Sequence, residues 1–292
     1  MQVAVFGRNF HASCRENVAI LFTRLEAMNA SVVLYRPFYD YLRSTAGLQP
    51  KVAGLFDGYR DLPEDVDFLF SVGGDGTFLE TLSIVRERSV PVVGLNTGRL
   101  GFLAYISQEN LIASLDSIFN GKYDLEERML LEITSSGNSV PDLNLALNEV
   151  RIYKNSASLV TIHVHVDGEF LSSYWADGLI LSTPTGSTAY NLSVGGPIVV
   201  PEADTMVLSP IAPHNLTNRP LVLPGKAKLQ FTVETREPMY QLALDSRSAE
   251  IPVEEKITVV RSEKTLRMVR IEKISFFSTL RDKLMWGIDK RN

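Results

Sequence analysis

Apolar positions follow two different periods along the chain, and the change between them lies close to residue 106. From Gln2 to about Tyr105, short apolar runs alternate with stretches of helical period. Runs that are apolar at nearly every position are typical of parallel strands covered on both faces of a sheet. The predicted strands lie at residues 3–7, 31–35, 67–72 and 91–96.

One helix is predicted between the first two of these runs. Over residues 16–30, apolar side chains recur at helical spacing, which indicates an amphipathic helix. They are Val18, Leu21, Leu25 and Met28. Residues 36–62, in contrast, are rich in aromatic and polar side chains without a clear period. We interpret that segment as an excursion from the sheet.

The pattern becomes β-rich after about Gln108. Residues 161–170, TIHVHVDGEF, alternate polar and apolar side chains and contain Asp167-Gly168. Alternation interrupted by an Asp-Gly pair is a strong signal of a β-hairpin. Two later segments, 228–235 and 256–271, repeat the alternation. These residues predict a β-rich domain.

The tail of the chain returns to a helical period. Residues 275–287, SFFSTLRDKLMWG, bring four apolar side chains to one side of a helix, and Gly287 predicts where that helix ends. The four are Phe276, Phe277, Leu280 and Leu284. The whole pattern predicts an α/β domain with a parallel sheet (1–106), a β-rich domain (107–271) and a closing helix (272–292) that packs back on the first domain.

Composition limits the function more than the fold. The chain has 292 residues, 45% hydrophobic and 22% charged, which fits two globular domains. Its net charge of −5 gives no general attraction to nucleic acid or to an anionic membrane. No apolar run is long enough to span a bilayer, and the N-terminus lacks a secretion signal. With Cys14 as its one cysteine, the chain is expected in the reducing cytoplasm.

A glycine-rich loop provides the first candidate site. Residues 71–80, SVGGDGTFLE, combine a strand end, a glycine turn and a helix start. Glycines let the backbone approach a phosphate closely, so the loop that contains Gly73, Gly74 and Gly76 is expected to hold a phosphate. The loop has neither the lysine of the phosphate-loop motif nor the third glycine of the dinucleotide fingerprint.

Asp75 within this loop needs a separate explanation, because a carboxylate beside phosphates is repelled by them. It can accept the proton of a hydroxyl group that attacks a phosphate. Alternatively it can hold Mg²⁺, whose charge removes the repulsion. Either role predicts a phosphoryl-transfer site, whereas the plainer interpretation is a tight turn with a surface aspartate.

Residues 182–199, STPTGSTAYNLSVGGPIV, provide a second candidate. Five of the seven residues from Ser182 to Thr188 carry hydroxyl groups, so the segment does not suit a core strand. A helix that starts near Thr188 would present hydroxyls and amides to a polar ligand. The alternative is an ordinary turn rich in serine and threonine.

These two motifs together resemble one known family. GGDGT is similar to the loop of a kinase superfamily that covers lipid kinases, 6-phosphofructokinases and NAD kinases. The segment 182–199 resembles the NAD kinase signature almost residue for residue. Three further segments are similar to that family, and the likeness is weakest at 36–62. They are LNEV (147–150), NTGRLGFLA (96–104) and SFFSTLRDKLMWG (275–287).

The resemblance implies a reaction and a fold. NAD kinases transfer the γ-phosphate of ATP, with Mg²⁺ or another divalent metal, to the 2′-hydroxyl of the adenosine ribose of NAD⁺. The family combines an N-terminal α/β domain with a C-terminal β-sandwich, commonly as homodimers or homotetramers. The resemblance makes Asp75 the general base, and it implies that NAD⁺ and ATP are the ligands. It also implies that Gly73, Gly74, Gly76 and Thr77 shape the site of the phosphate donor.

The same resemblance assigns residues to the NAD⁺ site. Asn148 and Glu149 would contact the ribose and adenine region, and Asp177 would meet the nicotinamide end. Because neighbouring strand residues point to opposite faces, Asn148 and Glu149 can share one ligand only at a strand end or bulge. Without the family context, Glu149 reads as an exposed strand glutamate. The other implied site residues are Asp75, Gly76, Thr188, Ala189, Tyr190, Asn191, Leu192 and Ser193.

Two residues depart from the family pattern. Arg247 stands in a DSR triplet where relatives often carry an amide, and it either reaches a ligand oxygen or is an ordinary surface arginine. Trp175 stands where relatives differ, and its indole either stacks on the nicotinamide or fills a gap. Both are kept as candidate contacts of the dinucleotide.

Three functions therefore stay open from the sequence. The chain is an NAD kinase, or another kinase of the superfamily that acts on a lipid or sugar, or a dinucleotide sensor without turnover. An intact Asp75 disfavours the sensor, and the polar segment 182–193 disfavours a lipid substrate. The redox form of the dinucleotide and the choice of ATP or polyphosphate as donor are left open.

Overall fold

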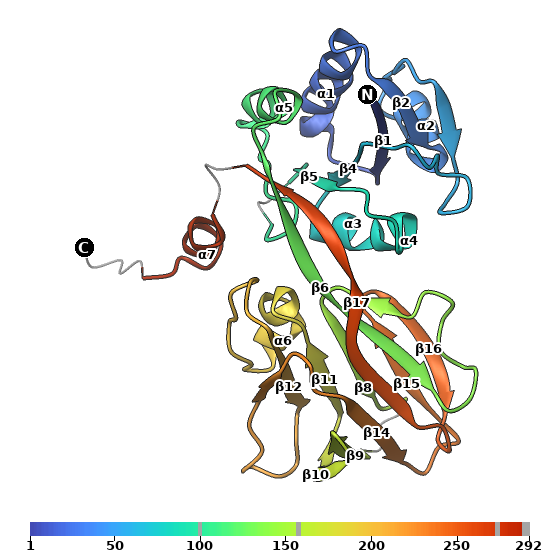
Figure 1. Ribbon diagram of the computed structural model, residues 1–292, viewed down its shortest axis with the longest axis vertical. Helices are drawn as coiled ribbons and strands as arrows, with labels where there is room; N and C mark the ends of the chain where they lie inside the picture. The colour runs from blue at the N-terminus through green and yellow to red at the C-terminus, as the bar shows by residue number, and fades with distance from the viewer. Residues whose placement is uncertain (99–100, 156–158, 272–274, 288–292) are drawn as a thin grey trace. The chain divides into compact units, whose positions relative to one another are not determined.

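The computed structural model describes residues 1–98, 101–155, 159–271 and 275–287 (Figure 1). Two compact units make up the chain: residues 1–127 together with 266–292, and residues 128–265. We call them the N-terminal and C-terminal units. Arg99 of the segment 96–104 and the ends of the segment 272–292 lie outside the described residues. The domain limits expected at 106 and 271 remain predictions.

A parallel sheet forms the centre of the N-terminal unit and confirms the predicted strands. Its five strands pair in the order β5-β4-β1-β2-β3, and the end of β17 pairs with β5 through Met268 and Val92. All residues of β4 and β5 are buried, as their continuous apolar character requires. The strands are β1 (Gln2–Gly7), β2 (Ser31–Tyr35), β3 (Gly54–Phe56), β4 (Phe68–Gly73), β5 (Val92–Asn96) and β17 (Ile257–Arg270).

Helices complete this unit. The predicted first helix is α1, which buries Val18, Leu21 and Leu25 against the sheet but leaves Met28 exposed beyond its end. Helices α1 and α5 lie side by side (Figure 1). The helices are α1 (Arg15–Ala27), α2 (Arg36–Ser44), α3 (Asp75–Glu80), α4 (Leu82–Val85), α5 (Leu111–Phe119) and α7 (Phe276–Leu284), with a 3₁₀ turn η1 (Ala12–Cys14).

The interpretation of residues 36–62 as an excursion was wrong. The segment contains α2 and also β3, which pairs parallel to β2 at the edge of the sheet. Helix α2 buries only Phe38 and Leu42, one turn apart, and β3 is three residues long. Two buried positions are too few to show a helical period, so only tertiary packing reveals these elements.

The closing helix α7 lies where it was predicted and belongs to the N-terminal unit. Ser275 caps its start by accepting a hydrogen bond from the Ser278 amide. Its end differs from the prediction, because Met285, with φ of 53°, leaves the helix two residues before Gly287. The predicted apolar side is also incomplete: Leu280 is buried, whereas Phe277 is exposed.

The C-terminal unit is a β-sandwich. One sheet has the order β13-β12-β11-β8-β15-β16, and the other contains β10-β9-β14-β17 with β6 and β7. Apolar side chains from both sheets form a single buried core. The strands are β6 (Asp124–Ser135), β7 (Leu145–Ala146), β8 (Glu149–Tyr153), β9 (Val160–Val166), β10 (Glu169–Ala176), β11 (Gly178–Ser182), β12 (Thr205–Ile211), β13 (Leu221–Pro224), β14 (Leu229–Glu234), β15 (Met239–Leu244) and β16 (Arg247–Pro252).

The predicted hairpin at Asp167-Gly168 is confirmed. The two residues join β9 to β10 and have φ angles of 51° and 88°. Positive φ at both central positions is the geometry that makes Asp-Gly a favourable two-residue turn.

Across the described ranges of the chain, no helix combines the length and apolar character needed to cross a bilayer.

The buried core of the C-terminal unit generates a stability prediction. Leu242 lies in β15 and is completely buried, whereas Leu216 of the same unit is 83% exposed. We expect Leu242→Ala to lower the free energy of unfolding by about 2–5 kcal/mol, because it leaves a cavity. The matched change Leu216→Ala should cost less than about 0.5 kcal/mol. Urea unfolding followed by tryptophan fluorescence measures both, and equal costs would contradict the assigned core.

Candidate active site

The glycines of the 73–77 loop differ in what surrounds them. A Cβ atom on Gly73 would stand 2.2 Å from Thr77 Oγ1, so packing within the loop requires glycine there. At Gly74 and Gly76 no atom of the described residues lies within 4 Å of the same position. Packing therefore explains the first glycine, whereas the other two leave open space through which a ligand can approach the backbone.

Asp75 is surrounded by hydrogen-bond donors. Its carboxylate accepts from the backbone amides of Phe102, Leu103 and Ala104 at 2.9, 3.0 and 2.9 Å. Lys283 of α7 approaches the Oδ2 atom at 3.4 Å through its Nζ atom. A carboxylate offers about four lone-pair directions, so these donors use all of them. Asp75 is thus an anchor for the backbone as well as a candidate base.

The segment anchored by Asp75 lies along strand β5. Ile106 donates its amide to the Gly94 carbonyl at 3.2 Å, and the Asn96 side chain donates to the Ala104 carbonyl at 3.1 Å. Gly94 permits this approach, because a Cβ atom there would stand 2.5 Å from the Leu103 carbonyl oxygen. The carboxylate therefore sits at the carboxyl ends of the parallel strands, where open α/β sheets bind ligands.

A second aspartate, Asp245, makes the same kind of anchor in the C-terminal unit. It accepts from the backbone amides of Leu147, Asn148 and Glu149 at 2.8, 2.7 and 3.1 Å. Asp245 is buried in the turn between β15 and β16, with φ of 53°. Burial raises its pKa, although the three amide bonds and Arg247 oppose that rise. The sequence analysis named Arg247 of the DSR triplet as a candidate but did not predict the anchoring role of Asp245.

Asn148 and Glu149 lie where the strand-end condition is met. Asn148 immediately precedes β8, and Glu149 is its first residue. Both side chains are buried, so the interpretation of Glu149 as an exposed strand glutamate was wrong. Glu149 Oε2 has no hydrogen-bond partner among the described residues. Burial, and next the charge of Asp245, raise the pKa of Glu149 to about 7.

The hydroxyl-rich segment forms two short helical turns, η2 (Thr185–Thr188) and α6 (Tyr190–Ser193). Thr183 holds it in place, since its hydroxyl donates to the Leu147 carbonyl at 2.6 Å and accepts from the Gly186 amide. A Cβ atom on Gly186 would stand 2.1 Å from the Asn148 carbonyl oxygen. The segment is therefore packed directly against the start of β8.

Members of the predicted 188–193 set differ in their freedom to meet a ligand. Asn191 is fully buried, and its amide is bonded to the Ser187 and Pro197 carbonyls and to the Ser209 hydroxyl. Its side chain thus secures the turn. Tyr190 and Ser193 are exposed, and Thr188, Ala189 and Leu192 are half-buried.

A cavity of about 250 Å³ brings two predicted residues together with cations that the sequence analysis missed. Asp177 and Tyr190 line it, and Lys154 Nζ pairs with Asp177 Oδ1 at 2.6 Å. Arg151 places its guanidinium 5.4 Å from the centre of the Tyr190 ring. Strand spacing could have indicated Arg151, because residues 149 and 151 share one face of β8. The other lining residues are Tyr153 and Ile211.

Trp175 and Arg247 have partners within the C-terminal unit. Trp175 is 49% exposed, and its ring lies 4.1 Å from that of His214, so it does not fill a core gap. Arg247 donates to the Leu143 and Leu145 carbonyls and lies 4.0 Å from Asp245. It is therefore not an ordinary surface arginine; it steadies the chain that leads to residue 147. A ligand contact for either residue remains a prediction.

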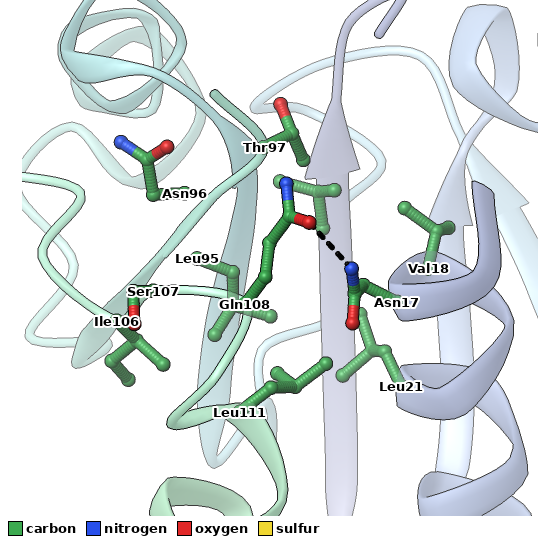
Figure 2. Close-up of a pocket in the computed structure, with 11 residues that line it drawn as sticks. Asn17, Val18, Leu21, Leu95, Asn96, Thr97, Ile106, Ser107, Gln108 and Leu111 are labelled. Carbon is green, nitrogen blue, oxygen red and sulfur yellow. Dashed lines mark hydrogen bonds between the residues drawn. The ribbon is translucent and has the colours of Figure 1, made fainter. Parts of the chain in front are cut away.

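A smaller pocket of the N-terminal unit does not fit a nucleotide. Figure 2 shows its lining, in which Asn17 donates to the Gln108 side chain at 2.7 Å, while Val18, Leu21 and Leu111 supply apolar walls. Its volume of about 20 Å³ is room for roughly one water molecule.

Sequence comparisons relate this chain to NAD kinases. Residues 55–123 match the sequence profile of the ATP-NAD kinase N-terminal domain, and residues 147–271 match that of the ATP-NAD kinase C-terminal domain. The chain is 43% identical to the NAD kinase of Flavobacterium psychrophilum and 40% identical to that of Cytophaga hutchinsonii. Both alignments cover 100% of this chain and of the relative.

Solved structures are similar over the same length. A yeast NADH kinase in complex with NADH has a TM-score of 0.85 at 25% identity and covers 99% of this chain and 89% of its own. An NAD kinase from Archaeoglobus fulgidus in complex with ATP has a TM-score of 0.76 at 27% identity, covering 98% and 99%. By the matched domains and by full-length identity, the chain belongs to the NAD kinase family.

Proposed function

We propose that this protein transfers the γ-phosphate of ATP to the 2′-hydroxyl of the adenosine ribose of NAD⁺ and so forms NADP⁺. Membership of the NAD kinase family over the full length of the chain carries the proposal. The ligands named for the two similar structures, NADH and ATP, are of the classes that this reaction joins. A lipid kinase or a sensor without turnover has no comparable support.

The C-terminal unit is proposed to bind the dinucleotide. Asn148 and Glu149 lie at a strand end, and Glu149 presents a buried oxygen that has no hydrogen-bond partner in the described part of the chain. Vicinal ribose hydroxyls are good donors to such a carboxylate. Asp177 and Tyr190 line the nearby cavity, and we propose that this cavity takes the nicotinamide end of the dinucleotide.

Asp75 is proposed to be the general base. Three backbone amides hold its carboxylate, and the longest of its contacts, 3.4 Å, is to Lys283 Nζ. A substrate hydroxyl can take the place of the ammonium group while the amides keep the carboxylate in position. Because phosphoryl transfer has a loose transition state, this positioning contributes more than the proton transfer itself.

Mg²⁺ is proposed to arrive with the phosphates of ATP. Across the described residues, no group of three His, Cys, Asp or Glu side chains is placed to hold a metal ion. Mg²⁺ in kinases is bound largely by substrate phosphates and one or two carboxylates. The alternative role of Asp75 as a metal ligand uses the same carboxylate oxygens as the base role, and these oxygens already accept from three backbone amides. Location in the cytoplasm and a homodimer or homotetramer remain expectations.

The reaction itself provides the first test. Purified protein with ATP, Mg²⁺ and NAD⁺ should yield NADP⁺, measured with an NADP⁺-specific dehydrogenase. Parallel assays with NADH and with polyphosphate determine the redox form and the donor. Phosphorylation of a diacylglycerol in place of NAD⁺ would support the lipid kinase, and tight NAD⁺ binding with no product would support the sensor.

The base assignment predicts the behaviour of Asp75→Asn. We expect turnover to fall by roughly 10²–10⁴-fold, because the amide cannot take up the proton and its NH₂ group cannot accept from the backbone amides that hold the carboxylate. Dinucleotide affinity, measured by calorimetry, should change only a few-fold. Asp40→Asn, which changes an exposed acid of the same unit, serves as the control. Full turnover of Asp75→Asn would remove the base assignment.

The open space beside Gly76 predicts a separation of stability from activity. In Gly76→Ala the added methyl group meets no atom of the described residues, and alanine favours the helix, so the melting temperature should hold or rise. The methyl should obstruct the phosphates and raise KM for ATP by about tenfold or more. Gly73→Ala should instead lower the melting temperature, because Thr77 must move. An unchanged KM in Gly76→Ala would place the phosphates elsewhere.

A further inference from the structure

Arg151 connects three parts of the dinucleotide site. Its guanidinium lies 5.8 Å from the ring centre of Tyr153 and 5.4 Å from that of Tyr190. Its Nη2 atom donates to the backbone carbonyl of Asp245 at 3.1 Å, and its Nε atom lies 3.9 Å from Glu149 Oε1. The Arg151 side chain thus lies beside Glu149 of its own strand, beside Tyr190 in the wall of the cavity, and against the turn of Asp245.

The surroundings of Glu149 need a positive charge, which Arg151 supplies. Two acids, Glu149 and Asp245, are buried beside each other, and like charges in a buried place oppose ionisation. Among the described residues, Arg151 is the basic side chain within 4.0 Å of a Glu149 oxygen. Arg247 faces Asp245 and donates to two backbone carbonyls. The charge of Glu149 is therefore balanced mainly by Arg151.

The separation of the two groups keeps the carboxylate available. A distance of 3.9 Å is too long for a hydrogen bond but short enough for strong electrostatic attraction. Glu149 Oε2 and Arg151 Nε are both buried, and neither has a hydrogen-bond partner in the described structure. A paired, bidentate arginine would use up the acceptors of Glu149, whereas this arrangement supplies charge and leaves an oxygen for a ligand.

We propose that Arg151 is a positioning residue of the dinucleotide site, which holds the buried Glu149 carboxylate charged and in place for ribose hydroxyls and supports the ring of Tyr190. The inference rests on the proposed function for its ligand, but the contact with Glu149 is independent of it. A phosphate is a poor match for this position, because the Glu149 carboxylate repels it. A sugar hydroxyl, which is neutral and donates a hydrogen bond, suits the free oxygen.

The ionisation of Glu149 determines how the affinity for NAD⁺ changes with pH. With a pKa of about 7, Glu149 is mostly protonated at pH 6 and mostly ionised at pH 8. The ionised form is the better acceptor for hydroxyl donors, so affinity for NAD⁺ should rise roughly tenfold across that range. Removal of Arg151 takes away an opposite charge and raises the pKa of Glu149 by about one unit.

A direct measurement tests this in the free protein. The Glu149 carboxyl carbon is titrated by NMR in ¹³C-glutamate-labelled protein and assigned by its loss in Glu149→Gln. Arg151→Met should move its midpoint upward by about one pH unit, and Arg151→Lys should restore it. Lys228→Met removes the same charge from an exposed site of the C-terminal unit and should leave the midpoint in place. An unmoved midpoint in Arg151→Met overturns the proposal.

NAD⁺ binding over pH 6–9 provides the functional measurement. By calorimetry, Arg151→Met should bind NAD⁺ roughly threefold more weakly than the unmodified protein at pH 7.5 and nearly equally at pH 9. Glu149→Gln should lose the pH dependence. A uniform loss of affinity at every pH would mean a merely structural role and would also overturn the proposal. If the NMR midpoint moves but no variant binds NAD⁺, the proposed function fails while the Arg151–Glu149 coupling stands.

Discussion

In each unit, one aspartate carboxylate accepts hydrogen bonds from three consecutive backbone amides. Asp75 holds residues 102–104, and Asp245 holds residues 147–149. In each segment the carboxylate takes up three backbone donors, and amides left without partners in a folded protein are costly. A charged acceptor satisfies all three at once and fixes the backbone direction. Asp75 itself and the candidate residues Asn148 and Glu149 are thus positioned by these two anchors.

The electrostatic cost differs between the two anchors. Asp75 is partly exposed and has Lys283 beside it, so water and an ammonium group offset its charge. Asp245 is buried, and its charge adds to the burial of Glu149, which raises the pKa of that neighbour to about 7. The arginines at 151 and 247 surround this buried pair of acids. The buried anchor Asp245 therefore adds to the effect of burial on Glu149, whose pKa is raised to about 7.

Several residue types serve the fold where the motif suggested a ligand. Gly73 accommodates Thr77, and Asn191 bonds three groups of its own unit, whereas Gly74 and Gly76 face open space. A motif records all of these positions alike, because loss of either a ligand contact or the supporting geometry disables a site. The structure separates them by what each side chain or missing side chain touches.

Local order was readable from the chain. Strand 31–35, the α1 helix and the Asp167-Gly168 turn follow from apolar period and turn chemistry, which act between close neighbours. The motifs likewise indicated phosphoryl transfer. Burial of Glu149, the anchor at Asp245 and the Lys154–Asp177 pair were decided only in three dimensions. Their partners lie far apart in the sequence, and desolvation depends on everything packed around a group, which no local pattern records.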